Sequence, residues 1–127
     1  MRGAANGLQT QGENIAMEIT LQPGEAAIDT WTLFYVPPQG GKYNGKLTVT
    51  NRRLLFDAKF DASLIGVLGH RAARGGLEID KDDIGDVEVS KSFFSKKAIV
   101  TLADGSRHVF DYGAMNIDKC AEAIRAR

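Results

Sequence analysis

The chain has 127 residues, of which 43% are hydrophobic and 25% charged, and this size and composition suit one ordinary globular domain. Sixteen lysine and arginine residues balance sixteen aspartate and glutamate residues. The resulting net charge of zero argues against a protein that coats nucleic acid by bulk charge, so we expect no nucleic-acid partner. The single cysteine, Cys120, cannot form an internal disulfide and fits a reducing compartment.

The apolar runs of the chain predict its location and its domain organisation. No segment approaches the roughly 20 apolar residues that a membrane span needs. No apolar run follows the first residues as it would in a secretory signal, and we therefore expect a cytoplasmic protein without a transmembrane segment. Residues 1–14 are polar, contain glycine and show no periodicity, which predicts a flexible tail before a single domain over residues 15–127.

The first part of the domain carries a strand pattern followed by turn residues. In residues 31–35 every second residue is Trp, Leu or Tyr, which predicts a strand with a buried face. The Pro-Pro-Gln-Gly-Gly run at 37–41 ends this strand, because proline cannot donate to the ladder and glycine adopts turn geometry. Asn44 and Gly45 predict a turn, since both residue types tolerate positive φ.

A hairpin and a long connection come next. The hairpin has predicted strands at residues 46–50 and 53–60, and in the second strand every even-numbered residue is apolar. This alternation predicts one buried and one solvent-facing side. Residues 61–76 are predicted to be a long connection that contains a helical turn. Further strands are predicted at 77–80, 84–91, 96–102 and 106–112, with Asp104 and Gly105 as the turn between the last two.

The end of the chain changes to a helical period. Ile117, Cys120, Ala121 and Ile124 have the i, i+3, i+4, i+7 spacing of one apolar stripe, and Asn116 is a suitable N-cap. The order is therefore about seven short strands followed by one helix. This predicts a mainly β fold of the α+β class, in which the helix covers a core that the antiparallel sheets leave open.

Two segments resemble a known family. Residues 45–56, Gly-Lys-Leu-Thr-Val-Thr-Asn-Arg-Arg-Leu-Leu-Phe, resemble the G-x-L-x-V-T-N-x-R-L-x-F hairpin of GRAM domains, which belong to the pleckstrin-homology-like (PH-like) superfamily. Residues 77–87 are similar to the family's I-P-x-x-D-I-x-x-V segment, with Asp80 where proline is more usual. The resemblance covers residues 19–127. It implies a PH-like, partly open barrel closed at one end by the terminal helix, and a module that binds phosphoinositides, other anionic lipids or proteins.

Although the net charge is zero, the charged residues are grouped into a basic, an acidic and a second basic zone along the chain. Residues 42–60 hold five basic residues against one acidic residue, residues 61–90 hold three against seven, and residues 91–109 hold four against one. In the first zone we take as binding candidates Lys42, Lys46 and Arg52. For the turn at residues 50–53 we nevertheless favour a structural role, because asparagine suits a turn and arginine can bond neighbouring carbonyls.

Residues 90–97, Ser-Lys-Ser-Phe-Phe-Ser-Lys-Lys, are the most suggestive segment, and their binding candidates are Lys91, Phe93, Phe94, Lys96 and Lys97. Strand alternation cannot bury two adjacent phenylalanines together. One hypothesis is a wedge that enters a bilayer interface while the lysines meet anionic headgroups. The simpler interpretation, which we place first, is that one phenylalanine caps the barrel core and the lysines keep an ordinary loop soluble.

The chain lacks the residue patterns of an enzyme or a metal site. His70 and His108 are far apart and have no metal-ligand spacing, so His108 is predicted to be a surface or satisfied strand residue. The acidic residues at 80–86 lack the glycine and closing glutamate of a calcium loop and predict a solvated turn. Cys120 lies in the apolar stripe and is predicted to be a buried hydrophobe.

We therefore expect a non-catalytic binding module with no cofactor and no metal. Its expected partner is an anionic lipid headgroup or phosphoinositide surface, which would place the cytoplasmic protein at the membrane periphery. The alternative is a protein-binding or self-associating module without a lipid role. The sequence leaves the ligand and the oligomeric state open.

Overall fold

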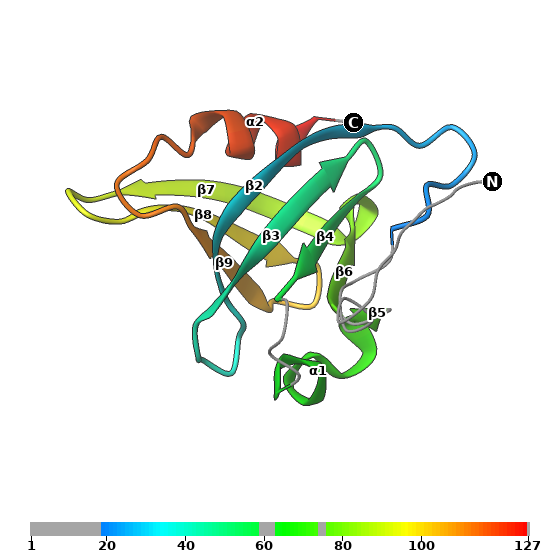
Figure 1. Cartoon of the computed structure of the whole chain (residues 1–127), viewed down its shortest axis with the longest axis horizontal. Coiled ribbons are helices and arrows are strands. Elements are labelled where there is room, and N and C mark those ends of the chain that lie inside the picture. Colours follow the sequence, from blue (N-terminus) through cyan, green and yellow to red (C-terminus); the bar gives the residue numbers. More distant parts are fainter. Residues whose placement is uncertain (1–18, 59–62, 74–75, 127) are drawn as a thin grey trace, which may run out of the picture.

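The computed structural model describes residues 19–58, 63–73 and 76–126 (Figure 1). The predicted tail at residues 1–14 lies outside these residues, as does the end of the strand predicted at 53–60. The strands are β2 (Ala27–Val36), β3 (Tyr43–Thr50), β4 (Arg53–Asp57), β5 (Ala72–Ala73), β6 (Gly76–Asp80), β7 (Ile84–Lys91), β8 (Lys96–Leu102) and β9 (Arg107–Asp111). The helices are α1 (Ser63–Leu68), α2 (Asp118–Arg125) and the short 3-10 turns η2 (Gly69–Arg71) and η3 (Lys81–Asp83).

The strands form one sheet in the order β5-β6-β4-β3-β2-β9-β8-β7, and all the pairings between described strands are antiparallel. Apart from the two-residue β5, seven strands make up this sheet. In Figure 1 β3 and β4 cross the direction of β7 and β8, so the sheet is bent into two halves. The described edge strands β5 and β7 are not hydrogen-bonded to each other, which leaves the barrel partly open. The fold is mainly β with one C-terminal helix packed against the sheet, as predicted.

The core lies between the two halves and rests on strand alternation. Trp31, Leu33 and Tyr35 are buried, whereas the residues between them are exposed, so the period-2 prediction for this strand is confirmed. Tyr35 is fully buried, and its ring packs 5.3 Å from the rings of Phe56 and Phe110, measured between centroids. Aromatic side chains from β2, β4 and β9 therefore meet at the centre of the core.

Helix α2 closes one end of the barrel. It packs on β7 and on β2 and β3 (Figure 1), and the whole predicted stripe is buried. The N-cap position is Ile117, one residue later than predicted, but the Oδ1 of Asn116 still accepts a hydrogen bond of 2.7 Å from the backbone N–H of Asp118. In the described parts of the chain no helix has the length and apolarity to cross a bilayer.

A buried lysine holds the C-terminal end of α2. The Nζ of Lys81, in η3, donates hydrogen bonds of 2.7 Å and 2.5 Å to the carbonyl oxygens of Ala123 and Ala126. Carbonyls in the last turn of a helix lack intrahelical donors and carry partial negative charge, so an ammonium group is a favourable partner. The side chain joins the junction between β6 and β7 to the far end of the chain.

The turn predicted at Asn44 and Gly45 is wrong, because both residues lie within β3. The chain reverses earlier, where Gly40 and Gly41 have φ of 97° and 93°. Gly45 serves a different purpose. A Cβ at this position would collide with the carbonyl oxygen of Asp57 and would lie 2.7 Å from the Cζ of Phe56. Glycine is needed there so that β4 and the Phe56 ring can approach β3.

Two further predictions change in the structure. Strand β4 was expected to expose one side, but Leu55 and Asp57 are buried as well as Leu54 and Phe56. Both faces of this strand are therefore covered, and its apolar alternation did not mark a solvent-facing side. The connection predicted at 61–76 contains the helix α1, whose Leu64 is fully buried, together with η2 and β5.

We predict that G45A lowers the free energy of unfolding by roughly 1–3 kcal/mol or more, because the added methyl group overpacks a backbone contact. The matched control is G66A in α1, where a Cβ meets nothing within 4 Å and alanine should stabilise the helix by about 0.5–1 kcal/mol. Urea unfolding of both variants measures the difference. Equal stability of G45A and wild type would show that β3 and β4 do not approach as described.

We predict that Cys120 does not react with thiol reagents in the folded protein. The residue is fully buried, and burial raises the pKa of its thiol to about 12, so the reactive thiolate is scarce at neutral pH. Absorbance titration should show very slow labelling in buffer and rapid labelling in denaturant. Rapid labelling of the native protein would contradict the packing of α2.

Candidate functional site

The predicted phenylalanine pair is fully presented to solvent. Phe93 and Phe94 are 79% and 76% exposed, and their rings pack edge to face with centroids 4.5 Å apart. The expectation that one of them caps the barrel core is therefore wrong. The core is already filled by Tyr35, Phe56 and Phe110, and the β7–β8 hairpin carries the pair beyond it. We call residues 91–97 the aromatic tip.

The aromatic tip is a short and well-bonded turn. Lys91 pairs with Lys96 at the ends of β7 and β8, which leaves residues 92–95 as the loop. The backbone N–H and the hydroxyl of Ser92 both donate to the carbonyl oxygen of Ser95, at 2.9 Å and 3.1 Å. The Nζ of Lys96 donates to the carbonyl oxygen of Phe93 at 3.0 Å. These bonds close the loop and leave both phenylalanine side chains outside the strand alternation.

The other lysines of the aromatic tip surround this turn. The Nζ of Lys91 forms an ion pair of 3.0 Å with the carboxylate of Asp118, the first residue of α2. Lys97 lies between Ser90 of β7 and Asp111 of β9 in the register of the sheet. The lysines therefore lie at the base of the turn that carries the phenylalanine pair.

Lys42 reaches the same end of the sheet from a distant part of the sequence. Its Nζ lies 4.7 Å from the ring centroid of Phe34, which is 40% exposed, and 3.9 Å from the Oδ2 of Asp111. The same Asp111 oxygen accepts a hydrogen bond of 2.9 Å from the hydroxyl of Ser95, in the aromatic tip. Asp111 thus links Lys42 to the tip, and part of the first basic zone lies beside the third.

The remaining candidates lie elsewhere. Lys46 is exposed on the outer face of β3, opposite Thr32 of β2. Arg52 lies in the turn between β3 and β4, next to the beginning of β2, whereas Lys42 lies near the end of β2. The structure therefore does not bring Arg52 together with the tip residues.

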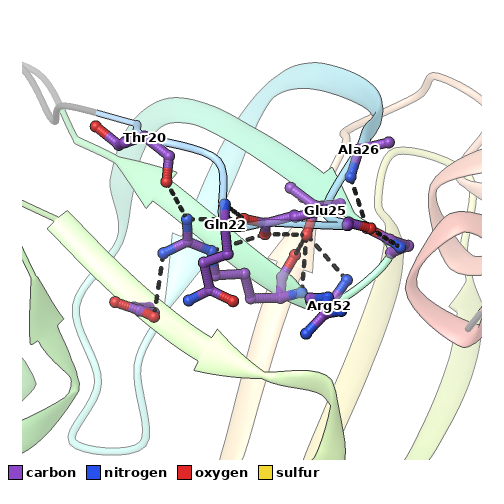
Figure 2. Close-up of polar contacts among 10 residues, drawn as sticks. Thr20, Gln22, Glu25, Ala26 and Arg52 are labelled. Carbon is purple, nitrogen blue, oxygen red and sulfur yellow. Dashed lines mark hydrogen bonds and ion pairs between the residues drawn. The ribbon is translucent and has the colours of Figure 1, made fainter.

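A buried carboxylate organises the turn that contains Arg52 (Figure 2). Glu25 has a fully buried side chain and accepts two hydrogen bonds from Arg53, of 2.8 Å from Nε and 3.0 Å from Nη2. It also accepts from the hydroxyl of Thr50 at 2.6 Å and from the backbone N–H of Gln22 at 2.8 Å. The hydrogen bonds from Arg53 are the main reason that the pKa of Glu25 falls to about 2, against the opposing effect of burial.

This network fastens residues 19–26 to the β3–β4 turn. The side chain of Asn51 accepts from the N–H of Ala26 at 2.7 Å and donates to the carbonyl oxygen of Gly24 at 3.1 Å. Arg53 also donates to Glu78 on β6. The structural role favoured for this turn agrees with these contacts, because the guanidinium of Arg53 is occupied by protein partners.

A second polar cluster lines a hollow of about 160 Å³ at the end of the barrel near α1, with Pro37, Pro38, Val67 and Leu68 as its apolar wall. The hydroxyl of Tyr35 lies 2.7 Å from the Nδ1 of His108, and the Nε2 lies 3.2 Å from the hydroxyl of Ser106. That hydroxyl donates to Asp104 at 2.6 Å, and Asp104 also accepts from Arg71. Because the Ser106 hydroxyl donates its hydrogen to the Asp104 carboxylate, it accepts from the Nε2–H of His108, and Nδ1 then accepts from the Tyr35 hydroxyl. Burial raises the pKa of Tyr35 well above its usual range, so this hydroxyl keeps its proton.

The direction of these bonds decides their chemistry. Since Tyr35 donates to His108 and Ser106 donates to Asp104, the imidazole does not take the proton of the serine hydroxyl, and the serine is not activated as a nucleophile. His108 is a satisfied buried strand residue, one of the two outcomes predicted for it. Within the described ranges no group of three or more His, Cys, Asp or Glu side chains could hold a metal ion.

One residue of the tip region was missed at the sequence level. Met115, in the loop between β9 and α2, is 58% exposed. An apolar residue within the uncharged run at residues 113–116 was the available signal, but the run is too short to show periodicity. The loop that carries it is bonded to the aromatic tip through the carbonyl oxygen of Gly113 and the N–H of Lys96, and this contact depends on strand pairing, which no local pattern reveals.

Comparison with known proteins supports the fold. No protein-family model and no curated protein matches this chain. The chain is similar to the crystal structure of the C-terminal domain of an unknown protein from Leishmania infantum, with a TM-score of 0.60 and 20% sequence identity, over 80% of this chain and 83% of that chain. At this identity the likeness shows a shared fold alone. The resemblance to GRAM domains stays a prediction.

We predict that the stability of the protein falls on acidification in two steps. Burial, with a smaller effect of the Arg71 charge, lowers the pKa of His108 from 6.5 to about 4, so the unfolded chain binds this proton more readily. The contribution of His108 is complete above pH 6.5 and falls by on the order of 3 kcal/mol as the pH drops to about 4. The contribution of Glu25 is complete above pH 4.5 and is lost as the pH falls toward 2.

Urea unfolding as a function of pH measures both steps, and H108Q separates them. This variant should lose the decline between pH 6.5 and 4 and keep the decline below 4.5. An H108Q profile identical to wild type would show that His108 titrates normally in the folded state.

Proposed function

We propose that this chain is a non-catalytic module of the GRAM and PH-like kind that docks on anionic membrane surfaces through its aromatic tip. The observation that carries the proposal is the exposed pair Phe93 and Phe94 on a lysine-flanked turn. Large exposed aromatic groups that the core does not use commonly mark an interaction surface. The lysines favour a partner with negative charge.

The charges around the tip support an anionic partner. Lys42, Lys91, Lys96 and Lys97 lie at this end of the sheet together with the carboxylates of Asp111 and Asp118. Asp111 is buried and accepts hydrogen bonds from Ser95 and from the N–H of Gly113, so of these two carboxylates only that of Asp118 is exposed. Each basic residue near an anionic membrane contributes about 1 kcal/mol.

Neither the positive charge of the tip nor its apolar area is sufficient by itself for membrane binding. Exposed charges are screened over about 8 Å at physiological salt, which limits a purely electrostatic contact. Full burial of a phenylalanine side chain contributes about 1.5–3 kcal/mol, and Phe93 and Phe94 are positioned for partial burial in the bilayer interface. If electrostatic attraction and apolar burial act together, membrane binding requires both anionic lipid and the phenylalanine side chains.

The alternative function, a protein-binding or self-associating module, would use the same exposed pair against an apolar protein surface. A lipid partner is favoured because lysines flank the pair on both sides of the turn and because a short turn with two exposed rings suits a shallow interface better than a flat protein contact. Self-association would appear as a concentration-dependent mass that depends on Phe93 and Phe94.

We predict that the wild-type protein co-sediments with vesicles of phosphatidylcholine and phosphatidylserine but not with phosphatidylcholine alone, and that salt weakens binding. F93S/F94S should reduce binding by tenfold or more without changing the charge. K91E/K96E/K97E should abolish it. Phosphoinositide vesicles of matched charge show whether the headgroup or the charge is recognised.

Matched controls use the far end of the sheet. I28S removes a side chain that is 45% exposed at the start of β2, and R52E reverses a charge in the β3–β4 turn. Both variants should bind as wild type does. Wild-type protein that stays in the supernatant with every anionic vesicle, or an I28S defect equal to that of F93S/F94S, would overturn the lipid proposal.

A further inference from the structure

We infer that the loop between β9 and α2, residues 112–117, is a second membrane-inserting element, and that Met115 enters the same anionic bilayer beside Phe93 and Phe94. This inference rests on the proposed function and adds a second contact to it. It predicts a docking surface built from two loops that are distant in sequence.

The two loops are joined by backbone hydrogen bonds. The N–H of Lys96 donates to the carbonyl oxygen of Gly113 at 2.8 Å, and the N–H of Tyr112 donates to the carbonyl oxygen of Lys96 at 2.9 Å. Figure 1 shows the β7–β8 turn and the β9–α2 loop at the same end of the molecule. An ion pair of 3.0 Å between Lys91 and Asp118 adds a side-chain connection. The loops therefore approach a surface together.

The composition of the second loop suits an interface. Residues 113–116, Gly-Ala-Met-Asn, carry no charge, and Met115 is 58% exposed. A methionine side chain is flexible and apolar, and adapts to an irregular environment such as the acyl boundary of a bilayer. No charged side chain of residues 113–116 has to lose its hydration on insertion.

Two backbone N–H groups of this loop already have partners within the protein. The N–H of Gly113 donates to Asp111 at 2.8 Å, and the N–H of Met115 donates to the carbonyl oxygen of Tyr112 at 3.2 Å. Transfer of an unpaired amide out of water is costly, so these internal bonds lower the cost of insertion.

The exposed acidic residue that follows the loop is compensated. Asp118 would be repelled by an anionic surface, but its carboxylate is paired with Lys91 of the aromatic tip. The ion pair offsets the negative charge of Asp118 and also connects the two loops. Insertion at two joined points, in place of one, restricts rotation of the module about the tip and holds the beginning of α2 close to the membrane.

The experiment uses the single buried cysteine of the chain. Since Cys120 is shielded, a cysteine introduced at an exposed position can be labelled selectively with an environment-sensitive fluorophore. The labelled variants are M115C, S92C in the aromatic tip and I28C at the start of β2, far from the tip. With mixed phosphatidylcholine–phosphatidylserine vesicles, the emission of M115C and S92C should shift to the blue, and that of I28C should not change.

Substitution of Met115 distinguishes insertion of its apolar side chain into the bilayer from a position merely close to the membrane. M115S should weaken partitioning to the same vesicles roughly threefold to tenfold, whereas M115L should bind as wild type does. Met115 is exposed, so both variants should keep the thermal stability of the wild type. A blue shift at position 92 with none at 115, or equal binding of M115S and M115L, would overturn the inference and leave the proposed function standing. No shift at either position, with no co-sedimentation, would overturn both.

Discussion

The short pairing of β2 with β9 is the constraint on which the rest of the structure depends. Among the described strands it is the hydrogen-bonded join between the two halves of the sheet, and it spans three residue pairs. Tyr35 lies in the middle of this join opposite Phe110, is fully buried, and packs against Phe56 from β4. A sheet bent at so narrow a join cannot cover its own core. The helix α2 has to complete it, and Lys81 holds the end of that helix in place.

Because the core is completed in this way, the exposed apolar groups have no structural task in it. Phe93 and Phe94 lie beyond the last inward-facing residues of β7 and β8. Keeping two aromatic rings in water is unfavourable. Their presentation on a closed, lysine-flanked turn is therefore best explained by a partner that buries them.

The other polar clusters show the contrast between structural and binding arrangements. In the Glu25 and Arg53 network, and in the series from Tyr35 through His108 to Asp104, donors and acceptors are matched within the protein. Matched groups of this kind stabilise one conformation and offer little to a ligand. At the aromatic tip the serines, Lys91 and Lys96 also have protein partners, whereas the rings of Phe93 and Phe94 remain exposed.

Local patterns were sufficient for much of this fold. The bounds of β7 and β8, the burial alternation of β2 and the apolar stripe of α2 all follow from periods of 2 and 3.6 residues, which neighbours along the chain impose. The aromatic tip was found in the same way, since two adjacent phenylalanines conflict with alternation. The local pattern could not tell whether the core would take one of them, because that depends on how much space the distant residues Tyr35 and Phe110 leave.

The features of the fold and the site that local patterns did not predict depend on contacts between distant segments. Gly45 looked like a turn residue and proved to be the point where β4 approaches β3, which is a matter of cross-strand space. Lys42 and Met115 joined the tip because β2, β9 and β8 are neighbours in the sheet although they are far apart in the chain. Arg52 was separated from the other candidates for the same reason. The types and spacing of side chains determine which secondary structure a segment can form. The strand order determines which segments become neighbours, and this order depends on the packing of the whole core.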